Sequence, residues 1–247
     1  MKSTFLFLCA LLSLGVCRPC VAEADTRCFE LRTYYAMPGK LEALEARFRD
    51  HTCKLFEKHG LVNVGYWVPQ ENPDNKLIYI IASPSREAHD KSWKDFFADP
   101  EWKKVKEDSE ANGKLVGKVD SVFLKATDFS PAIAPASKAP RVFELRTYSA
   151  APGKLDALQT RFREHTLALF TKHGMTNVAY WTRTDEGSNQ LVYILAHASK
   201  EAADASFKAF SADPDWNAAK SASEANGALV EKVESIFMQP LDFSPIK

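Results

Sequence analysis

The sequence predicts an α+β protein in which two β-α-β-β-α-β repeats pack sheet against sheet as one intramolecular barrel. The first observation is a duplication: residues 28–131 align with residues 142–245 without a gap, at a constant shift of 114, and 59 of the 104 positions are identical. The second is that strand-like and helix-like hydrophobic patterns alternate within each copy. A four-stranded sheet with helices on one face leaves its other face bare, and the second copy is the natural cover.

The first half of each copy predicts a strand followed by a helix. Residues 28–35 alternate apolar and polar side chains with a period of two, which is typical of a strand. Apolar residues then recur at helical spacing over 41–56, and Gly60 supplies the left-handed stop that often ends a helix. The pair therefore predicts one β-α unit.

The second half predicts a hairpin, a helical layer and a final strand. Residues 62–68 and 76–82 are β-rich and flank a turn rich in Pro, Asn and Asp. Helical pieces over 85–97 and 99–113 begin with the N-cap residues Ser and Asp, and residues 118–125 form the last strand. The order is that of the ferredoxin-like split unit.

The domain organisation follows from the duplication. We expect a signal peptide over 1–24, a first α+β repeat over 25–131, an Ala/Pro-rich linker over 132–141 and a second α+β repeat over 142–247. Two repeats of this kind predict a monomeric pseudo-dimer, and a higher homo-oligomer stays open.

The N-terminus has the pattern of a secretory signal. A basic start is followed by an apolar run over 5–16 and by small residues at positions 22 and 24. We therefore predict export, with a periplasmic or secreted protein after cleavage near Ala24. The run is shorter than the roughly 20 residues that cross a bilayer, and no later segment predicts a membrane span.

Charge and cysteine content bear on nucleic-acid binding, on metal or cofactor sites and on a disulfide. Lys plus Arg and Asp plus Glu are equal at 32 each, so no basic field favours nucleic acid. No spacing of Cys and His predicts a metal site or another cofactor. Cys28 and Cys53 remain after signal removal, and export permits a disulfide between them, which the sequence leaves open.

Four short strings, each present twice, resemble the NIPSNAP family. In the first copy they are Glu30-Leu31-Arg32-Thr33-Tyr34, Pro38-Gly39-Lys40-Leu41, Gly65-Tyr66-Trp67 and Ala98-Asp99-Pro100-Glu101-Trp102. The second copy carries them 114 residues later, with Ala179 in place of Gly65 and Asp215 in place of Glu101. The resemblance implies the dimeric α/β-barrel fold, whose superfamily includes cofactor-independent monooxygenases. It transfers no catalytic residue, because the family has no agreed ones.

Polar residues on the first strand of each copy are candidates for ligand binding. Their shared face is expected to point between the two sheets, where they form either a polar pocket or an ion pair that satisfies itself. These residues are Glu30, Arg32, Tyr34, Glu144, Arg146 and Tyr148.

Two further residue types are candidates on the helices and hairpins. His51 and His165 fall on the apolar stripe of the first helix of each copy, which suggests either a pocket base or a core histidine bonded to backbone. Trp67 and Trp181 are expected to pack in the core or to line an aromatic-tolerant pocket.

Three functions remain open from the sequence. The first is an exported protein that binds a small, partly apolar molecule in the barrel between its repeats. The second is a cofactor-independent monooxygenase or isomerase that uses His51 or His165 as its base. The third is a structural or interaction module with a filled interior.

Overall fold

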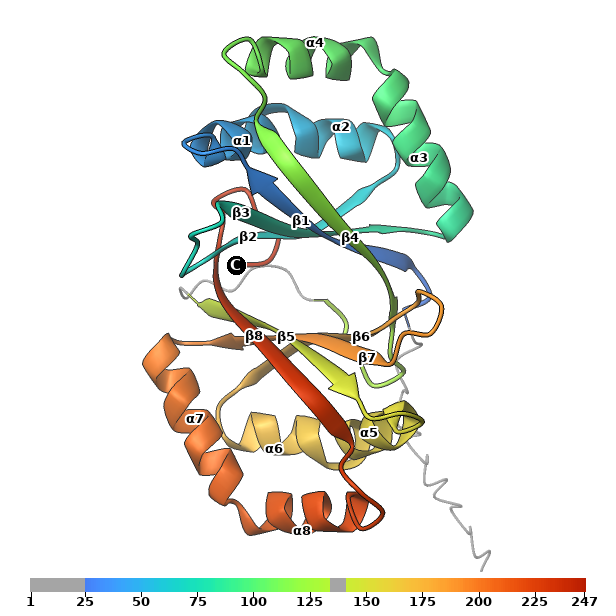
Figure 1. The fold of residues 1–247 in the computed structure, drawn as a ribbon, viewed down its shortest axis with the longest axis vertical. Coiled ribbons are helices and arrows are strands. Elements are labelled where there is room, and N and C mark those ends of the chain that lie inside the picture. Colours follow the sequence, from blue (N-terminus) through green and yellow to red (C-terminus); the bar gives the residue numbers. More distant parts are fainter. Residues whose placement is uncertain (1–24, 134–140) are drawn as a thin grey trace, which may run out of the picture.

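A computed structural model describes residues 25–133 and 141–247, and its eight strands form one closed barrel with helices on the outside. In Figure 1 the helices α1 to α4 lie above one half of the barrel and α5 to α8 below the other. The predicted α+β barrel of two repeats is confirmed. The predicted signal peptide and residues 134–140 of the predicted linker lie outside the described residues.

The elements of the first repeat follow the predicted order. They are β1 (Cys28–Ala36), α1 (Leu41–Arg47), the π-helical turn η1 (Phe48–Thr52), α2 (Cys53–Lys58), β2 (Val62–Pro69), β3 (Lys76–Ser83), α3 (Arg86–Ala98), α4 (Pro100–Ser109) and β4 (Val116–Ala126).

The second repeat has the same elements. They are β5 (Val142–Ala150), α5 (Leu155–Arg161), the π-helical turn η2 (Phe162–Thr166), α6 (Leu167–Lys172), β6 (Thr176–Arg183), β7 (Gln190–His197), α7 (Lys200–Ala212), α8 (Pro214–Ser223) and β8 (Val230–Pro240).

The last strand of each repeat closes the barrel by pairing with the other repeat. The strand order is β1-β3-β2-β8-β5-β7-β6-β4, and every pairing is antiparallel. Strand β4 runs along β1 and then pairs with β6, where Lys125 opposes Thr182. Strand β8 likewise runs along β5 and pairs with β2, where Val68 opposes Gln239. Each extension removes an edge that would otherwise expose unpaired backbone groups.

Apolar side chains from both repeats fill the centre of the barrel. Phe29 packs edge-on against Trp181 at 5.7 Å between ring centroids, and Trp67 lies 5.8 Å from Phe143. All four rings are essentially inaccessible to solvent. Burial of this apolar surface is the main force that holds the two sheets together. The prediction that polar residues line this central space is wrong. Of the two roles left open for Trp67 and Trp181, the structure shows core packing.

The opposite face of each sheet packs against its own helices, and the predicted polar residues lie there. Glu30, Arg32 and Tyr34 share this outer face, whereas Phe29 and the partly buried Leu31 belong to the barrel interior. A period of two shows which residues share a face, but it does not show which face meets the helices. The predicted orientation of β1 and β5 was therefore inverted.

A π-helical turn interrupts the first helix of each repeat and changes which residues point inward. The hydroxyl of Thr52 donates to the carbonyl of Arg47 at 3.1 Å, five residues back. The extra residue in the turn places Thr52 on the buried side with Phe48 and leaves His51 exposed. His165 is exposed for the same reason. The prediction that both histidines lie on the buried stripe is wrong.

Candidate functional site

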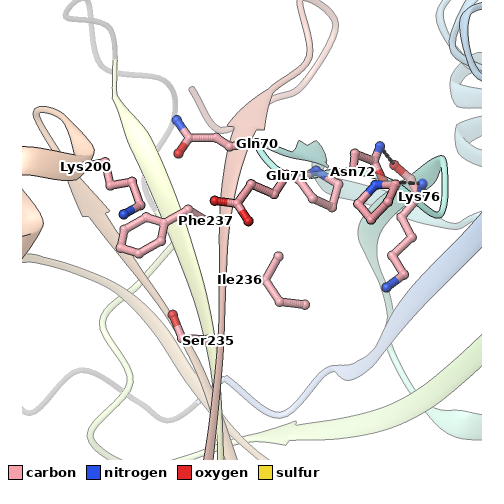
Figure 2. A pocket seen from close by; sticks show the side chains of 10 residues that line it. Gln70, Glu71, Asn72, Lys76, Lys200, Ser235, Ile236 and Phe237 are labelled. Atoms are coloured by element: carbon pink, nitrogen blue, oxygen red, sulfur yellow. Dashed lines mark hydrogen bonds between the residues drawn. The ribbon is translucent and has the colours of Figure 1, made fainter.

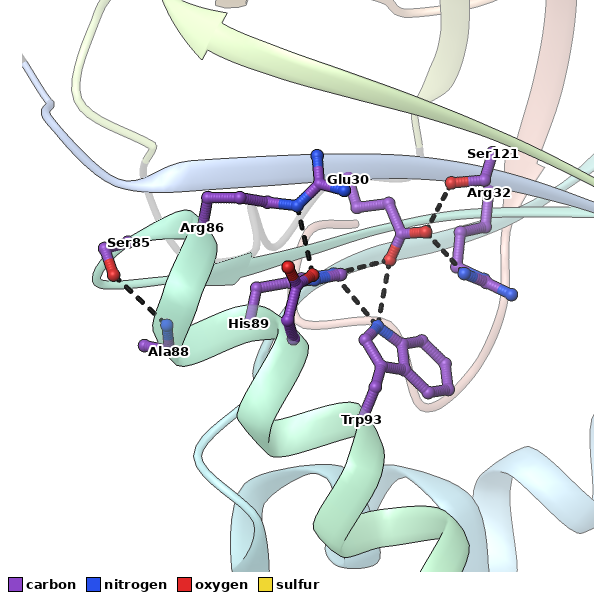
Figure 3. A network of polar contacts seen from close by, with 9 residues as sticks. Glu30, Arg32, Ser85, Arg86, Ala88, His89, Trp93 and Ser121 are labelled. Atoms are coloured by element: carbon purple, nitrogen blue, oxygen red, sulfur yellow. Dashed lines mark hydrogen bonds and ion pairs between the residues drawn. The ribbon is translucent and has the colours of Figure 1, made fainter.

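A buried polar cluster joins β1, β4 and α3 in the first repeat (Figure 3). The Glu30 carboxylate, 1% exposed, accepts hydrogen bonds from Arg32 and from the Ser121 hydroxyl. Nε2 of His89 lies 2.8 Å from the second carboxylate oxygen, and the Trp93 indole nitrogen donates to it at 3.2 Å. One carboxylate thus ties two strands to the helix that covers them.

The ionised form of Glu30 is stabilised by its partners. Burial alone raises the pKa of this carboxyl, because it removes the charge from water. The bond to His89, the charge of Arg32 and the bond from Ser121 outweigh that effect, so the pKa of Glu30 lies below its ordinary value. The Arg32 guanidinium correspondingly stays protonated.

The second repeat builds the same cluster around Glu144. Its carboxylate accepts from Arg146 and from the Ser235 hydroxyl at 2.6 Å, and His197 Nε2 lies 3.2 Å away. Burial again raises the pKa of Glu144, but the His197 bond and the Arg146 charge bring it below its ordinary value. Each repeat therefore keeps one buried carboxylate in its charged form.

The imidazole reaches the two carboxylates from different positions in the chain. His89 stands on helix α3, where the second repeat has Ala203. His197 ends strand β7, where the first repeat has Ser83. Alignment of the repeats gives no hint that these two histidines share a role, and only the folded structure places both beside the equivalent carboxylate.

The geometry of this cluster indicates a structural role rather than a catalytic one. Arg32 lies over the Trp93 ring, with Cζ 4.4 Å from the centroid, and Arg146 lies over Phe207 at 4.6 Å. The carboxylates are fully enclosed by their own partners. Of the two alternatives that the sequence left open, the geometry matches the buried ion pair, in which the carboxylates are satisfied although Arg32 Nε has no hydrogen-bond partner.

A pocket between the sheet and the helices occurs at equivalent positions in both repeats. Its volume is about 230 Å³ in the first repeat and about 340 Å³ in the second. The residues shared by both linings are Tyr34, Arg47, Trp102, Lys106, Glu110, Val116, Lys118 and Val119, with Tyr148, Arg161, Trp216, Lys220, Glu224, Val230, Lys232 and Val233 as their equivalents. An aromatic wall thus faces a set of charged groups in each repeat.

A buried arginine forms the inner polar group of each pocket. Arg47 Nη1 donates to Glu110 at 3.1 Å and lies over the Trp102 ring, and Nε has no hydrogen-bond partner. Arg161 repeats the arrangement with Glu224 at 2.7 Å, and its Nε is also without a partner. These pairs tie the first and last helices of each repeat together. Both Nε atoms are closed off from solvent, and the pocket side of each arginine is its guanidinium end.

The pocket tyrosines connect the pockets to the buried clusters. Arg146, which pairs with Glu144, also donates through Nη2 to the Tyr148 hydroxyl at 3.2 Å. Tyr148 lines the second pocket and Tyr34 the first. Of the predicted site residues, these two tyrosines reach the pockets, and the Glu–Arg pairs stand behind them.

A third cleft, of about 360 Å³, lies where β2 meets β8 (Figure 2). The turn after β2 forms one wall, with Asn72 bonded to the backbone of Lys76. Ile236, Phe237 and Lys200 come from the second repeat. Lys76 is already paired with Asp74 at 2.8 Å. At the other seam Arg183 stands where this cleft has Pro69, so the two seams differ in sequence at this position.

His165 lines a shallow groove between α5 and α8, with a volume of about 470 Å³. Its ring is about half exposed and lies 3.9 Å from Glu164, so the groove does not enclose it. His51 lines none of the three pockets described above. The structure therefore does not bring either histidine together with Arg32 or Arg146.

The sequence prediction missed the most distinctive pocket residues, Arg47 and Arg161. A usable signal was present, because Arg47 and Glu110 both recur at the equivalent positions of the second copy. Arg47 also follows the buried Leu44 by three residues within α1, a spacing that places both side chains on one helix face.

Several other findings concern only the residues that the structure describes. No three His, Cys, Asp or Glu side chains gather there as ligands for a metal ion. Among residues 25–133 and 141–247, no helix has the length and apolar character to cross a membrane. Cys28 and Cys53 are free thiols rather than a disulfide pair.

A closed eight-stranded barrel of two α+β repeats, with pockets beneath the helices, defines a protein of the dimeric α/β-barrel fold in which one chain supplies both halves of the barrel. The family model described as NIPSNAP matches residues 29–131 and again residues 143–245. The chain belongs to the NIPSNAP family, with two copies of its domain. None of the curated proteins compared matches it.

Solved structures share this fold at low sequence identity. A putative monooxygenase from Fusobacterium nucleatum is 9% identical with a TM-score of 0.59, over 88% of this chain and 93% of its own. A putative monooxygenase from Lactobacillus acidophilus is 11% identical with a TM-score of 0.55, over 87% and 94%. An uncharacterized NIPSNAP domain protein from Burkholderia xenovorans is 25% identical with a TM-score of 0.37, over 42% and 98%.

Proposed function

We propose that this protein binds a small, partly apolar molecule in each of the two pockets between sheet and helices. The observation that carries the proposal is the recurrence of one pocket, with the same aromatic and charged lining, in both repeats. The second pocket, at about 340 Å³, lies at the lower end of the range of about 300–1,000 Å³ for small-ligand sites, and the first, at about 230 Å³, lies below that range.

The lining indicates what kind of molecule fits. In the second repeat the depth of the pocket is aromatic, with Phe162, Phe170 and Phe210 beside Trp216. Arg161 and the Tyr148 hydroxyl supply polar contacts at its side. A flat ring system can stack on the aromatic wall, and a substituent that accepts hydrogen bonds can meet the arginine.

Binding is a better supported proposal than oxygenation. The oxygenase alternative draws on the descriptions of fold neighbours, and its expected bases were His51 and His165. Both are exposed, outside the paired pockets. The buried histidines, His89 and His197, are engaged with carboxylates and do not line these pockets. None of these four histidines therefore supplies a base to either pocket.

The proposal can be tested by following the indole N–H signals of the protein in two-dimensional NMR. The chain has five tryptophans, of which Trp102 and Trp216 each line one pocket. Trp67 and Trp181 are enclosed in the barrel and serve as internal controls. Titration with 2-naphthamide and with 2-naphthoate should shift the signals of Trp102 or Trp216 and leave the barrel signals in place.

A matched pair of variants identifies the pocket as the site. Ala228 lies on the rim of the second pocket, and Ala225 is exposed in the preceding turn, away from that lining. Ala228→Phe should weaken probe binding at Trp216 at least about tenfold by obstructing the entrance, whereas Ala225→Phe should not. The proposal fails if neither probe moves either pocket signal at millimolar concentration, or if both variants bind alike.

We also propose that the mature protein is exported. The support is the signal-like pattern of residues 1–24, and the proposal is independent of the pockets. Intact mass of the protein recovered from the periplasm or medium of an expressing bacterium should correspond to a chain beginning at Asp25. Recovery of the full-length chain in the cytoplasm alone contradicts it.

A further inference from the structure

We infer that the two pockets have diverged in charge, so that the first-repeat pocket prefers an aromatic acid and the second-repeat pocket prefers a neutral aromatic molecule. This inference rests on the proposed binding function and assigns a ligand class to each pocket. It comes from comparing equivalent lining positions, at which most residues are shared and a few are not.

Two lining positions change the charge balance. Lys114 on the rim of the first pocket is replaced by Ala228 in the second, and Gly117 is replaced by Glu231. The first pocket therefore has four cations against the single carboxylate of Glu110, and the second has three cations against two carboxylates.

The additional charges are not neutralised by neighbouring side chains. Glu110 is engaged by Arg47 at 3.1 Å and by Lys106 at 3.4 Å. Among the described residues, Lys114 has no carboxylate within ion-pair distance, and Glu231 has no cation within that distance. A ligand carboxylate in the first pocket thus finds an unpaired ammonium group, whereas one in the second pocket approaches an unpaired carboxylate.

The shape of each pocket has changed together with its charge. A side chain at Gly117 would place its Cβ 3.0 Å from the Met37 sulfur, whereas the second repeat has the smaller Ala151 at the position of Met37. Phe97, 55% exposed and stacked on Trp93, lines the first pocket, and its equivalent is Ser211. The first pocket is the smaller of the two, with a more basic rim.

Exchange of the diverged residues between the repeats tests the inference. The indole signals of Trp102 and Trp216 report each pocket separately, and 2-naphthoate and 2-naphthamide differ mainly in charge. In the unmodified protein, Trp102 should respond at lower concentrations of the acid than of the amide, and Trp216 should show the opposite order.

Lys114→Ala should weaken 2-naphthoate at Trp102 about fivefold and leave 2-naphthamide within about twofold. Glu231→Gly should strengthen 2-naphthoate at Trp216 by a similar factor. Gly117→Glu, combined with Met37→Ala to make room, should also weaken binding of 2-naphthoate at Trp102. Each variant leaves the aromatic walls intact, so the amide controls for folding.

The outcomes separate this inference from the proposed function. If the amide binds at both tryptophans but the acid-to-amide ratio is equal in the two pockets and unchanged by Lys114→Ala and Glu231→Gly, the charge divergence is refuted and the binding function stands. If neither probe shifts either signal, the binding function itself is refuted.

Discussion

The buried cluster around Glu30 can be tested by a rescue experiment, because the two repeats hold the histidine at different positions. The first repeat can therefore be converted to the arrangement of the second. His89→Ala in the first repeat removes the ring that lies 2.8 Å from the carboxylate. Adding Ser83→His then reproduces the second repeat, where His197 stands at that position and alanine occupies the position of His89.

The expected magnitude follows from the contacts that remain. A hydrogen bond to a charged group contributes about 1.5–3 kcal/mol, and loss of the ring also opens a small cavity. Glu30 keeps Arg32, Ser121 and Trp93 as partners, so the carboxylate is not left isolated. We therefore expect His89→Ala to lower the free energy of unfolding by about 2 kcal/mol.

Rescue needs room for the relocated ring. In the second repeat the His197 ring has Phe207 as a neighbour, with 6.1 Å between centroids, and the first repeat has the larger Trp93 at that position. The comparison should therefore be made in a Trp93→Phe background. There, adding Ser83→His to His89→Ala should restore about 1 kcal/mol or more.

Urea unfolding followed by far-ultraviolet circular dichroism measures the effect without depending on tryptophan fluorescence. The midpoint should fall in His89→Ala and rise again on addition of Ser83→His, with an unchanged slope. His197→Ser is the matched change in the second repeat and should cost a similar amount. The reasoning is refuted if the relocated histidine leaves the midpoint unchanged, or if His89→Ala and His197→Ser are both neutral.

Three further predictions concern charge, helix capping and the exposed histidines. Because the folded pKa of Glu30 is lowered, its contribution to stability is present above the unfolded carboxyl pKa of about 4.3 and is lost as pH falls through the folded pKa. Glu30→Gln should therefore be less stable than the unmodified protein at pH 7, and the difference in urea midpoint should shrink between about pH 5 and pH 3; a constant difference contradicts the linkage. Ser85 and Ser199 cap α3 and α7 by accepting from backbone N–H groups at 3.1 Å, so alanine at either position should cost about 1 kcal/mol in urea unfolding, and equal stability argues against the caps. His51→Ala and His165→Ala together should change stability by less than about 0.5 kcal/mol per site and leave naphthamide binding intact, and a loss of binding in NMR titration argues for a role in the site.

The pattern of the sequence was sufficient for the fold because the duplication makes each signal appear twice. Alternation over β1 predicts a strand, and its recurrence over β5 excludes coincidence. A single sheet with one covered face needs a partner, and a second copy on the same chain supplies it. These inferences depend on local periodicity and on repetition, and both can be determined from the sequence alone.

The location of the candidate site was harder to predict from the sequence, as Glu30 and His51 illustrate. Glu30 was predicted to point between the sheets, because the wrong face of its strand was assigned to the helices. His51 was predicted to be buried, because the helix was assumed to be regular. Tyr34 lines a pocket, but this pocket lies between sheet and helices rather than between the two sheets. The direction in which a side chain points depends on how an element sits against its neighbours, which local periodicity does not record.

By itself, the sequence determined the duplication, the order of strands and helices, and the family, because these depend on spacing and composition. The tertiary structure alone decided that Phe29, rather than Glu30, faces the barrel, and that two histidines from unrelated positions serve equivalent carboxylates. It also decided that Arg47 is buried beside Glu110 in a pocket, and that a π-helical turn leaves His51 exposed. Apolar burial selects the sheet face that closes the barrel, and the polar residues then pair wherever that choice leaves them.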